Sequence, residues 1–257
     1  MSIKIVVPIS GGKDSQACLK LALEQYDKSE VLGLFCDTKW EHPLTYAHIE
    51  KIKDLYGVDI KTINNGSVVG VVKKFKTFPT SRFRICTSQL KIEPSKRFYI
   101  ELATQQQQGF EVWMGMRRGE SNDREKRYKG VVGDEVYAPH EMGKTFPKYL
   151  NTKLNVWMRL PIVDWIDKDV FEFLEGSQNI LYSMGSKRVG CFPCLASGDK
   201  SKEHDFFNGG VFGLKQYEIV KDLAKITNNP IFTSKGGALR NNDNQDDLFQ
   251  GCAFCAI

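Results

Sequence analysis

The segment that most constrains the fold lies near the N-terminus, where a short apolar run ends in a pair of glycines. The run covers residues 4–9, and a helical pattern of apolar residues begins at Gln16. Between them stand Ser10, Gly11, Gly12, Lys13, Asp14 and Ser15. This order is typical of a buried strand, a tight turn and the first turn of a helix. The sequence therefore predicts an α/β fold that begins with a strand–loop–helix unit.

The loop has the chemistry of an anion site. Glycine tolerates the backbone angles that turn neighbouring N–H groups toward one point. The following helix offers unpaired N–H groups and the positive end of its dipole, which suits phosphate. Lys13 adds a charge, and Ser10 and Ser15 add hydroxyl donors. The spacing differs from that of the GxxxxGK[ST] nucleotide loop. We expect Asp14 mainly to cap the helix.

Alternating strand and helix patterns continue along the chain. Strands are expected at 4–9, 31–36, 58–63 and 157–162, with a further apolar strand ending near residue 114. Helices are expected at 16–26, 44–56, 95–104, 168–174 and 214–226, and a loop at 131–156. Gly57 is a suitable C-terminal cap for the second helix. Such alternation predicts a parallel sheet whose ligands bind beyond the carboxyl ends of its strands.

The SGGKDS sequence resembles the pyrophosphate-binding loop of the adenine nucleotide α-hydrolase superfamily. Four later segments, in order, resemble the phosphoadenosine phosphosulfate (PAPS) reductase family within it, so that the likeness spans about residues 3–198. These segments are Asp37–Thr45, Phe83–Pro94, Gly115–Arg124 and the stretch from Pro161 to Cys194. Lys39 stands where the family has glycine, and lysine takes a positive φ only at a cost, which leaves the shape of that turn open.

The resemblance implies a Rossmann-like parallel sheet flanked by helices and a set of site residues. The residues implied to bind the nucleotide are Ser10, Gly11, Gly12, Lys13, Asp14, Ser15, Asp37, Arg84, Lys91 and Gly115. Lys13, Arg117 and Arg124 are the implied catalytic residues. Arginine suits bidentate recognition of phosphate or sulfate. Glu120 is interpreted either as part of the chemistry or as a carboxylate that orients Arg117 or Arg124.

The seven cysteines include two CxxC pairs, which indicate metal or redox chemistry in a chain of this length. The pairs are Cys191 with Cys194 and Cys252 with Cys255. One hypothesis is a single four-cysteine site built from both pairs. Another, suggested by the family position of Cys86, combines it with Cys191, Cys194 and one of the last two. A [4Fe–4S] cluster and Zn²⁺ both fit such ligands. Cys18 and Cys36 are expected in the core.

Positive charge is concentrated in one window, although the formal net charge is only +5. Residues 73–97 carry one acid, Glu93, and eight basic residues: Lys73, Lys74, Lys76, Arg82, Arg84, Lys91, Lys96 and Arg97. Such a window suits a nucleotide, a nucleic acid or another polyanionic acceptor, or else is a solvated basic face. We expect no membrane span or signal peptide, a cytoplasmic location, and a second copy of the chain as a partner in a homodimer.

Two domains are expected: a PAPS reductase-like nucleotide-binding domain at 1–198, and a C-terminal extension at 199–257 that returns a CxxC to the metal site. Three functions stay open. The intact loop favours an enzyme that binds ATP with Mg²⁺ and releases pyrophosphate, as in the DNA phosphorothioation enzymes of the Dnd type that the chain resembles. The alternatives are a thiol-dependent reductase of PAPS or adenylyl sulfate (APS), and a non-catalytic, metal-stabilised nucleic-acid-binding protein.

Overall fold

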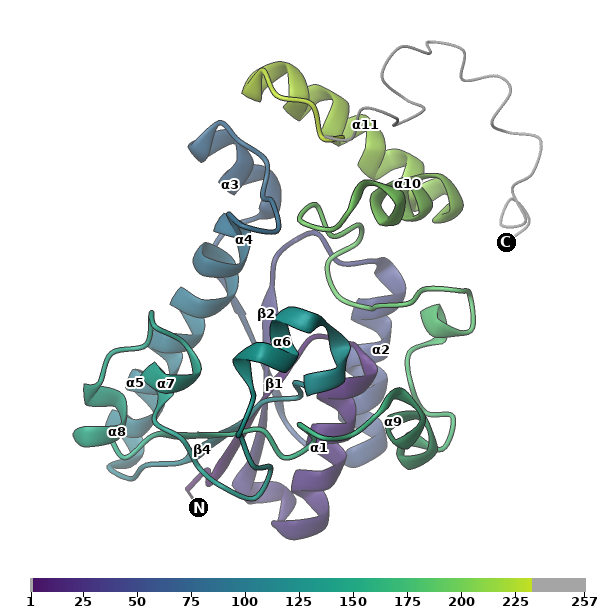
Figure 1. Ribbon diagram of the computed structural model, residues 1–257. Coiled ribbons are helices and arrows are strands. Elements are labelled where there is room, and N and C mark those ends of the chain that lie inside the picture. Colours follow the sequence, from purple (N-terminus) through teal and green to yellow (C-terminus); the bar gives the residue numbers. More distant parts are fainter. Residues whose placement is uncertain (1, 233–257) are drawn as a thin grey trace.

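Five parallel strands form the sheet at the centre of the computed structural model, which describes residues 2–232 (Figure 1). Their order across the sheet is β3-β2-β1-β4-β5. The strands are β1 (Ile5–Ile9), β2 (Val31–Asp37), β3 (Ile60–Asn64), β4 (Glu111–Trp113) and β5 (Trp157–Arg159). All four pairings are parallel, so every strand ends at the same edge. Because the order reverses at β1, the switch point lies between β1 and β4, where such sheets bind ligands.

Helices follow the strands as the sequence predicts for right-handed crossovers. The longer ones are α1 (Lys13–Gln25), α2 (Pro43–Tyr56), α3 (Val68–Phe75), α5 (Glu93–Gln106), α9 (Asp167–Leu174), α10 (Asp199–Asn208) and α11 (Gly210–Thr227). The short ones are α4 (Ile85–Thr87), α6 (Asn122–Arg127), α7 (Pro139–Met142) and α8 (Tyr149–Thr152). A π segment, Ser88–Ile92, joins α4 to α5, and single 3₁₀ turns lie at Lys28–Glu30, Arg118–Glu120 and Ile180–Tyr182.

The two faces of the sheet bury alternate residues of β1, as the period of two of a strand requires. Ile5 and Val7 pack with Leu19 of α1 and Ile52 of α2 on one face. Val6 lies in the core of the opposite face, which α5 covers. In Figure 1, α1, α2 and α9 accordingly lie to one side of the strands and α5 to the other. The predicted fold, a Rossmann-like α/β sheet flanked by helices, is confirmed.

A third apolar cluster lies beyond the carboxyl edge of the sheet and joins distant parts of the chain. It brings α3 together with α10 and α11, and Trp40 from the β2–α2 loop lies within it. Phe206 of α10 and Val220 of α11 are fully buried there. Figure 1 shows these helices at the top of the molecule, above the strands. The extension predicted from residue 199 therefore packs, over its described part, against the sheet edge that carries the predicted site.

Several expected boundaries are close to the observed ones, but one strand is shorter than expected and one expected loop contains helices. Helix α2 begins at Pro43, whose missing N–H costs nothing at a first helical position, and ends at Gly57 with φ +59°. β5 stops at Arg159, earlier than expected, because Val163 N–H turns back to the Leu160 carbonyl. The expected loop at 131–156 contains α7 and α8. Within residues 2–232, no helix combines the length and apolar character needed to cross a membrane.

Candidate functional site

The glycine loop between β1 and α1 is packed so tightly that its two glycines have no room for side chains. Gly11 has φ +75°, and a Cβ there would lie 2.4 Å from Thr45 Cγ2. At Gly12 an added Cβ would lie 2.9 Å from the Val189 carbonyl oxygen. The Ser15 hydroxyl donates to the Gly12 carbonyl at 2.9 Å, which closes the loop onto the first turn of α1. The loop is thus a preformed backbone turn at a helix N-terminus, as an anion site requires.

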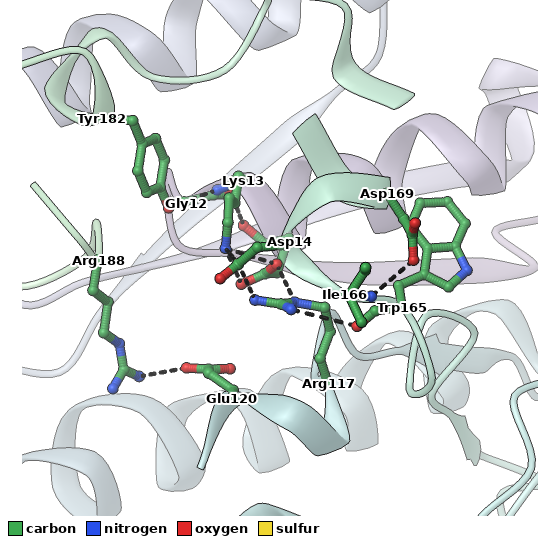
Figure 2. Close-up of polar contacts among 12 residues, drawn as sticks. Gly12, Lys13, Asp14, Arg117, Glu120, Trp165, Ile166, Asp169, Tyr182 and Arg188 are labelled. Carbon is green, nitrogen blue, oxygen red and sulfur yellow. Dashed lines mark hydrogen bonds and ion pairs between the residues drawn. The ribbon is translucent and has the colours of Figure 1, made fainter. Parts of the chain in front are cut away.

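Two cations and two carboxylates meet where α1 begins (Figure 2). Lys13 Nζ lies 3.2 Å from Asp14 Oδ1 and 2.8 Å from Asp167 Oδ1. Arg117 Nε lies 2.7 Å from Asp14 Oδ1, and its Nη2 lies 2.6 Å from Asp167 Oδ1. Lys13 and Arg117 are almost fully buried, whereas the Asp167 side chain is 70% exposed. An incoming anion can therefore reach the two cations from the side that Asp167 covers.

The contacts within this group favour the charged forms of Asp167 and Arg117. A hydrogen bond from Lys13 lowers the pKa of Asp167 below its ordinary value, even though burial opposes this. Burial would lower the pKa of Arg117, but the Asp14 and Asp167 carboxylates outweigh it and raise that pKa. The carboxylates thus neutralise two cations that would otherwise repel each other.

The expectation that Asp14 caps α1 is wrong. The N-cap position is Gly12, and no side chain makes a capping hydrogen bond there. The Asp14 carboxylate bonds to Lys13 and Arg117 instead. Arg117 therefore depends on Asp14 and Asp167 for its orientation, while Glu120 pairs with Arg124, one of the two partners expected for it. Arg188 is a second, longer contact of Glu120 at 3.9 Å.

Two residues from the segment before Cys191 hold the loop in place. Lys13 N–H donates to Tyr182 Oη at 3.0 Å, and Asn179 Nδ2 donates to the Gly11 carbonyl at 3.2 Å. Burial raises the pKa of Tyr182 to about 12, so the phenol stays neutral. Sequence reasoning assigned neither residue a role, nor did it include Asp167 in the site. Tyr182 and Asp167 both lie in the stretch from Pro161 to Cys194 that resembles the family. That resemblance is the sequence signal that could have pointed to them.

Gly115 places the chain after β4 directly against the loop. A Cβ on Gly115 would lie 2.5 Å from the Asp14 carbonyl oxygen and 2.8 Å from Ser15 Cα. This backbone contact brings Arg117, two residues later, to Asp14. The role of Gly115 visible in the structure is thus close packing of two backbone segments.

Asp37 ends β2 at the same edge and organises the turn that follows. Its carboxylate accepts from Lys39 N at 2.8 Å and from Tyr46 Oη at 2.8 Å, and Lys39 Nζ lies 2.5 Å from it. Burial raises its pKa, but the Lys39 contacts outweigh burial and keep that pKa low. Lys39 has φ +56°, so the turn takes a left-handed backbone although lysine replaces glycine there. The two contacts to Asp37 offset the strain, roughly 1–2 kcal/mol for a left-handed L-residue.

The remaining predicted contacts lie apart from this ionic group. Arg84 is exposed and donates to the Ser81 carbonyl within its own turn. Lys91 lies beside Cys191 and Glu41, and the charge of Cys191 is the largest influence that raises the Lys91 pKa. Among residues 2–232, the structure therefore brings Lys13, Asp14 and Arg117 together and leaves Arg84 and Lys91 in other surroundings.

Three of the five predicted metal ligands lie near one another. Cys86 and Cys191 pack against the cluster beyond the sheet edge, and burial, followed by the charges of Cys191 and Cys194, raises the pKa of Cys86. Their sulfurs are soft donors that suit zinc or an iron–sulfur cluster. In the described part of the chain, however, no three metal-binding side chains converge on one point. Cys252 and Cys255 lie outside the described residues. The donor types fit a metal centre completed by a further ligand.

The two other cysteines differ in burial. Cys18 is fully buried in the core between α1 and the sheet, as expected. Cys36 is partly buried, and its sulfur lies 3.3 Å from Ser95 Oγ. Among the cysteines of residues 2–232, neither has a recorded contact with another thiol, so both are suitable as reference cysteines in experiments.

Comparison with solved structures finds matches of low sequence identity. PAPS reductase from Candida auris, in a phosphate complex, is 18% identical over 74% of this chain and 81% of its own, with a TM-score of 0.50. FMN adenylyltransferase from Candida glabrata is 16% identical over 73% and 55%, with a TM-score of 0.45. The U34-tRNA thiolase NcsA from Methanococcus maripaludis, with its [4Fe-4S] cluster, is 15% identical over 94% and 77%, with a TM-score of 0.47.

A family model identifies the chain more directly than these structures do. Among curated proteins, none matches the sequence. The model for the phosphoadenosine phosphosulfate reductase domain matches residues 4–197, which include the glycine loop, Arg117, Asp167 and the first CxxC pair. With a match over most of its length, the chain belongs to the phosphoadenosine phosphosulfate reductase domain family.

Proposed function

We propose that this chain is an enzyme that binds ATP at the Ser10–Ser15 loop, cleaves it to AMP and pyrophosphate, and adenylates an acceptor for sulfur-transfer chemistry. The observation that supports the proposal is that Lys13 and Arg117 lie together at the N-terminus of α1, where both contact Asp167. Two cations, a helix dipole and glycine amides there suit a group with several negative charges. Pyrophosphate carries more charge than a single phosphate or sulfate, which supports ATP as the nucleotide.

In the proposed reaction an acceptor oxygen attacks the α-phosphorus of ATP, and the bond to the pyrophosphate oxygen breaks. A sulfur nucleophile would then displace AMP from the adenylated acceptor. In the first step, negative charge grows on the leaving pyrophosphate. Lys13 and Arg117 would release the Asp167 carboxylate and bind the oxygens of the pyrophosphate instead. The N–H groups of Gly11 and Gly12 would hold the pyrophosphate in place. Groups that are positioned before the reaction stabilise such charge without reorganisation, so catalysis would consist mostly of positioning and electrostatics. Arg124, held by Glu120, is proposed to contact the acceptor or nucleotide.

Two inorganic components complete the proposal. Mg²⁺ bound with the nucleotide would neutralise part of the phosphate charge, and Asp14 offers it a hard carboxylate ligand. A metal centre with cysteine ligands, either a [4Fe–4S] cluster or Zn²⁺, would be held by Cys86, Cys191, Cys194 and a cysteine of the second CxxC pair. When bound, a cluster would supply a site for sulfur or electrons. The likeness to DNA phosphorothioation enzymes stays a hypothesis about the acceptor.

The second candidate is a thiol-dependent reductase that acts on PAPS or APS. The family match favours it, because the matching model is named for PAPS reductase. In that reaction a thiolate attacks the sulfur of the sulfonucleotide and releases the adenosine phosphate. The nucleophile would be a C-terminal cysteine, Cys252 or Cys255, outside the described residues.

The test compares nucleotides and a loop variant in the full-length protein, purified without oxygen. We expect ATP-dependent pyrophosphate release that Lys13→Ala abolishes while the circular dichroism spectrum and melting temperature stay near those of the wild type. Lys20→Ala is the matched control, because Lys20 lies on the same helix and pairs with Glu175, away from the loop. Turnover of PAPS or APS without pyrophosphate release from ATP would favour the reductase. Binding of nucleic acid without turnover of any nucleotide would favour the third alternative, a non-catalytic nucleic-acid-binding protein.

A further inference from the structure

The structure divides the basic window of residues 73–97 into two parts. Three of its cations are engaged within the protein: Lys91 beside Cys191, Lys96 with Glu93 at 2.6 Å, and Arg97 with Asn65 at 2.6 Å. The other five are exposed: Lys73, Lys74, Lys76, Arg82 and Arg84. Within residues 2–232, none of these five lies within 4.0 Å of a carboxylate. Their charge is therefore available to a partner.

Two phenylalanines lie among these five cations with their rings exposed. Phe75 is 40% exposed and Phe83 is 53% exposed. Lys74 Nζ lies 5.6 Å from the centre of the Phe75 ring. Phe78, between them in sequence, is buried in the cluster beyond the sheet edge, so the protein has an apolar site nearby that these two rings do not use. We call the exposed residues Lys73–Lys76 and Arg82–Arg84 the α3 surface.

A tight turn holds Phe83 out from the body of the protein. Thr80 N–H donates to the Phe83 carbonyl at 3.0 Å, and Phe83 N–H donates to Thr80 Oγ1 at 3.0 Å. Arg84 Nε bonds back to the Ser81 carbonyl at 3.3 Å. The turn thus fixes the backbone of Phe83, which stands between Arg82 and Arg84 in the sequence. A ring presented in this way has a face available for stacking.

The α3 surface belongs to the same edge of the molecule as the glycine loop. Helix α3 begins where Val68 N–H donates to the carbonyl of Thr38, the residue after β2. Because β1 and β2 are parallel, the Thr38 turn and the Ser10–Ser15 loop lie at the same ends of neighbouring strands. A polymer on the α3 surface could therefore extend toward the loop.

We propose that the α3 surface binds single-stranded nucleic acid, with phosphates on the five cations and bases stacked on Phe75 and Phe83. Cationic grooves with exposed aromatic rings bind single strands in this way, because every base has a face that stacks. A duplex hides those faces, so a single strand can use both the cations and the exposed rings. This inference rests on the proposed function, since it gives the adenylating enzyme a nucleic acid as its acceptor.

The experiment uses the full-length protein and fluorescein-labelled single strands of DNA and RNA of about 20 nucleotides, long enough to cover a typical single-strand site. We expect binding that weakens with salt, with a slope of log K against log salt of up to about −3.5, from roughly 0.7 for each of five phosphates. The same sequence as a duplex, and vesicles rich in phosphatidylserine, are the competing ligands.

Two variants separate charge from stacking. Lys73→Gln/Lys74→Gln/Lys76→Gln should reduce the salt slope by about 2, because three phosphate contacts are lost. Phe83→Ala should weaken single-strand binding roughly 5- to 150-fold, the range for loss of one stacked base, and leave the slope unchanged. The controls are Lys51→Gln/Lys53→Gln/Lys61→Gln, three exposed lysines on α2 and β3, and Tyr149→Ala, an exposed aromatic residue on α8.

The outcomes are distinct from those that test ATP cleavage. Lys13→Ala should bind the single strand as the wild type does, so loss of pyrophosphate release with intact binding supports the α3 surface independently. Absence of oligonucleotide binding would overturn the proposal, as would equal effects of the control variants. Equal affinity for the duplex with no effect of Phe83→Ala would overturn the stacking part. Binding to vesicles but not to oligonucleotides would assign the surface to a membrane instead.

Discussion

The Asp167 carboxylate lies 2.8 Å from Lys13 Nζ, and the same oxygen, Oδ1, lies 2.6 Å from Arg117 Nη2. One exposed carboxylate from α9 thus bridges two nearly buried cations at the start of α1. An anion that binds the loop has to compete with this carboxylate. The affinity of the site therefore depends on a residue outside the loop.

Asp167→Asn should strengthen binding of inorganic pyrophosphate by roughly two- to fivefold, because the anion no longer displaces a charged competitor from a solvent-exposed ion pair. Isothermal titration calorimetry of the purified protein measures this. The variant also removes a favourable charge from the first turn of α9, so its melting temperature should fall slightly.

The control for this prediction is Asp164→Asn, which removes a carboxylate that pairs with Arg118. It should leave pyrophosphate affinity unchanged. Weaker binding by Asp167→Asn would show instead that the carboxylate positions Lys13 and Arg117 for the anion.

Gly11→Ala should destabilise the protein and weaken pyrophosphate binding. The added methyl meets Thr45 Cγ2, and alanine at φ +75° costs roughly 1–2 kcal/mol in backbone strain alone. Urea unfolding gives the change in free energy. Gly11→Ala/Thr45→Ser removes the clashing methyl group and should recover the steric part of the loss but not the strain. A double variant no more stable than the single one would exclude the clash as a cause.

The free energy of unfolding should decrease as the pH is lowered from about 6.5 to 4, because of His48. Burial lowers the pKa of His48 to about 4, and its Nε2 lies 2.9 Å from Gln16 Oε1. The unfolded chain, with an ordinary histidine pKa near 6.5, binds the proton first as pH falls, so protonation favours unfolding. The loss is about 2 kcal/mol at pH 5 relative to pH 7.5.

Urea unfolding at the two pH values, in the wild type and in His48→Gln, isolates this contribution. The glutamine variant should lose about 2 kcal/mol less than the wild type over the same interval, since it has no proton to bind there. Equal losses in the two proteins would assign the pH dependence to other groups.

Cys191→Ser should remove a bound metal from protein purified without oxygen. The charge of Cys191 acts on both Cys86 and Lys91, and serine is a poor ligand for the soft metals that thiolates hold. Elemental analysis for iron and zinc, with an absorption spectrum, measures the loss. Cys36→Ser is the control, because Cys36 contacts Ser95 rather than the thiols. Wild-type protein without iron or zinc would contradict the metal hypothesis.

The parts of this fold that were predictable depend on neighbours in sequence. The loop, the start of α2 at Pro43 and its end at Gly57 follow from the backbone preferences of glycine and proline. The strand order could be expected only as a parallel sheet, because register and neighbours depend on packing. The turn at Lys39 shows the limit of local rules, since Asp37 offsets a backbone angle that lysine disfavours.

The partners within the site were not predictable from local pattern. Asp14 has the position of an ordinary residue in the first turn of a helix, yet its carboxylate binds Arg117, 103 residues away. Asp167 reaches Lys13 because α9 packs against α1, and no spacing rule in the sequence contains that contact. Local pattern thus predicted the loop and its cation Lys13, but not the carboxylates that pair with Lys13 and Arg117.

The burial of Trp40 among residues of α10 and α11 has a consequence for how this protein can vary. Those helices follow residue 197, where the match to the family ends, yet Phe206 and Val220 complete the apolar cluster that holds the β2–α2 loop. The apolar cluster therefore extends beyond the segment that the family model matches. A substitution at Val220 can therefore disturb the cluster that contains Trp40, and a chain shortened to residue 197 would lose Phe206 and Val220 from that cluster.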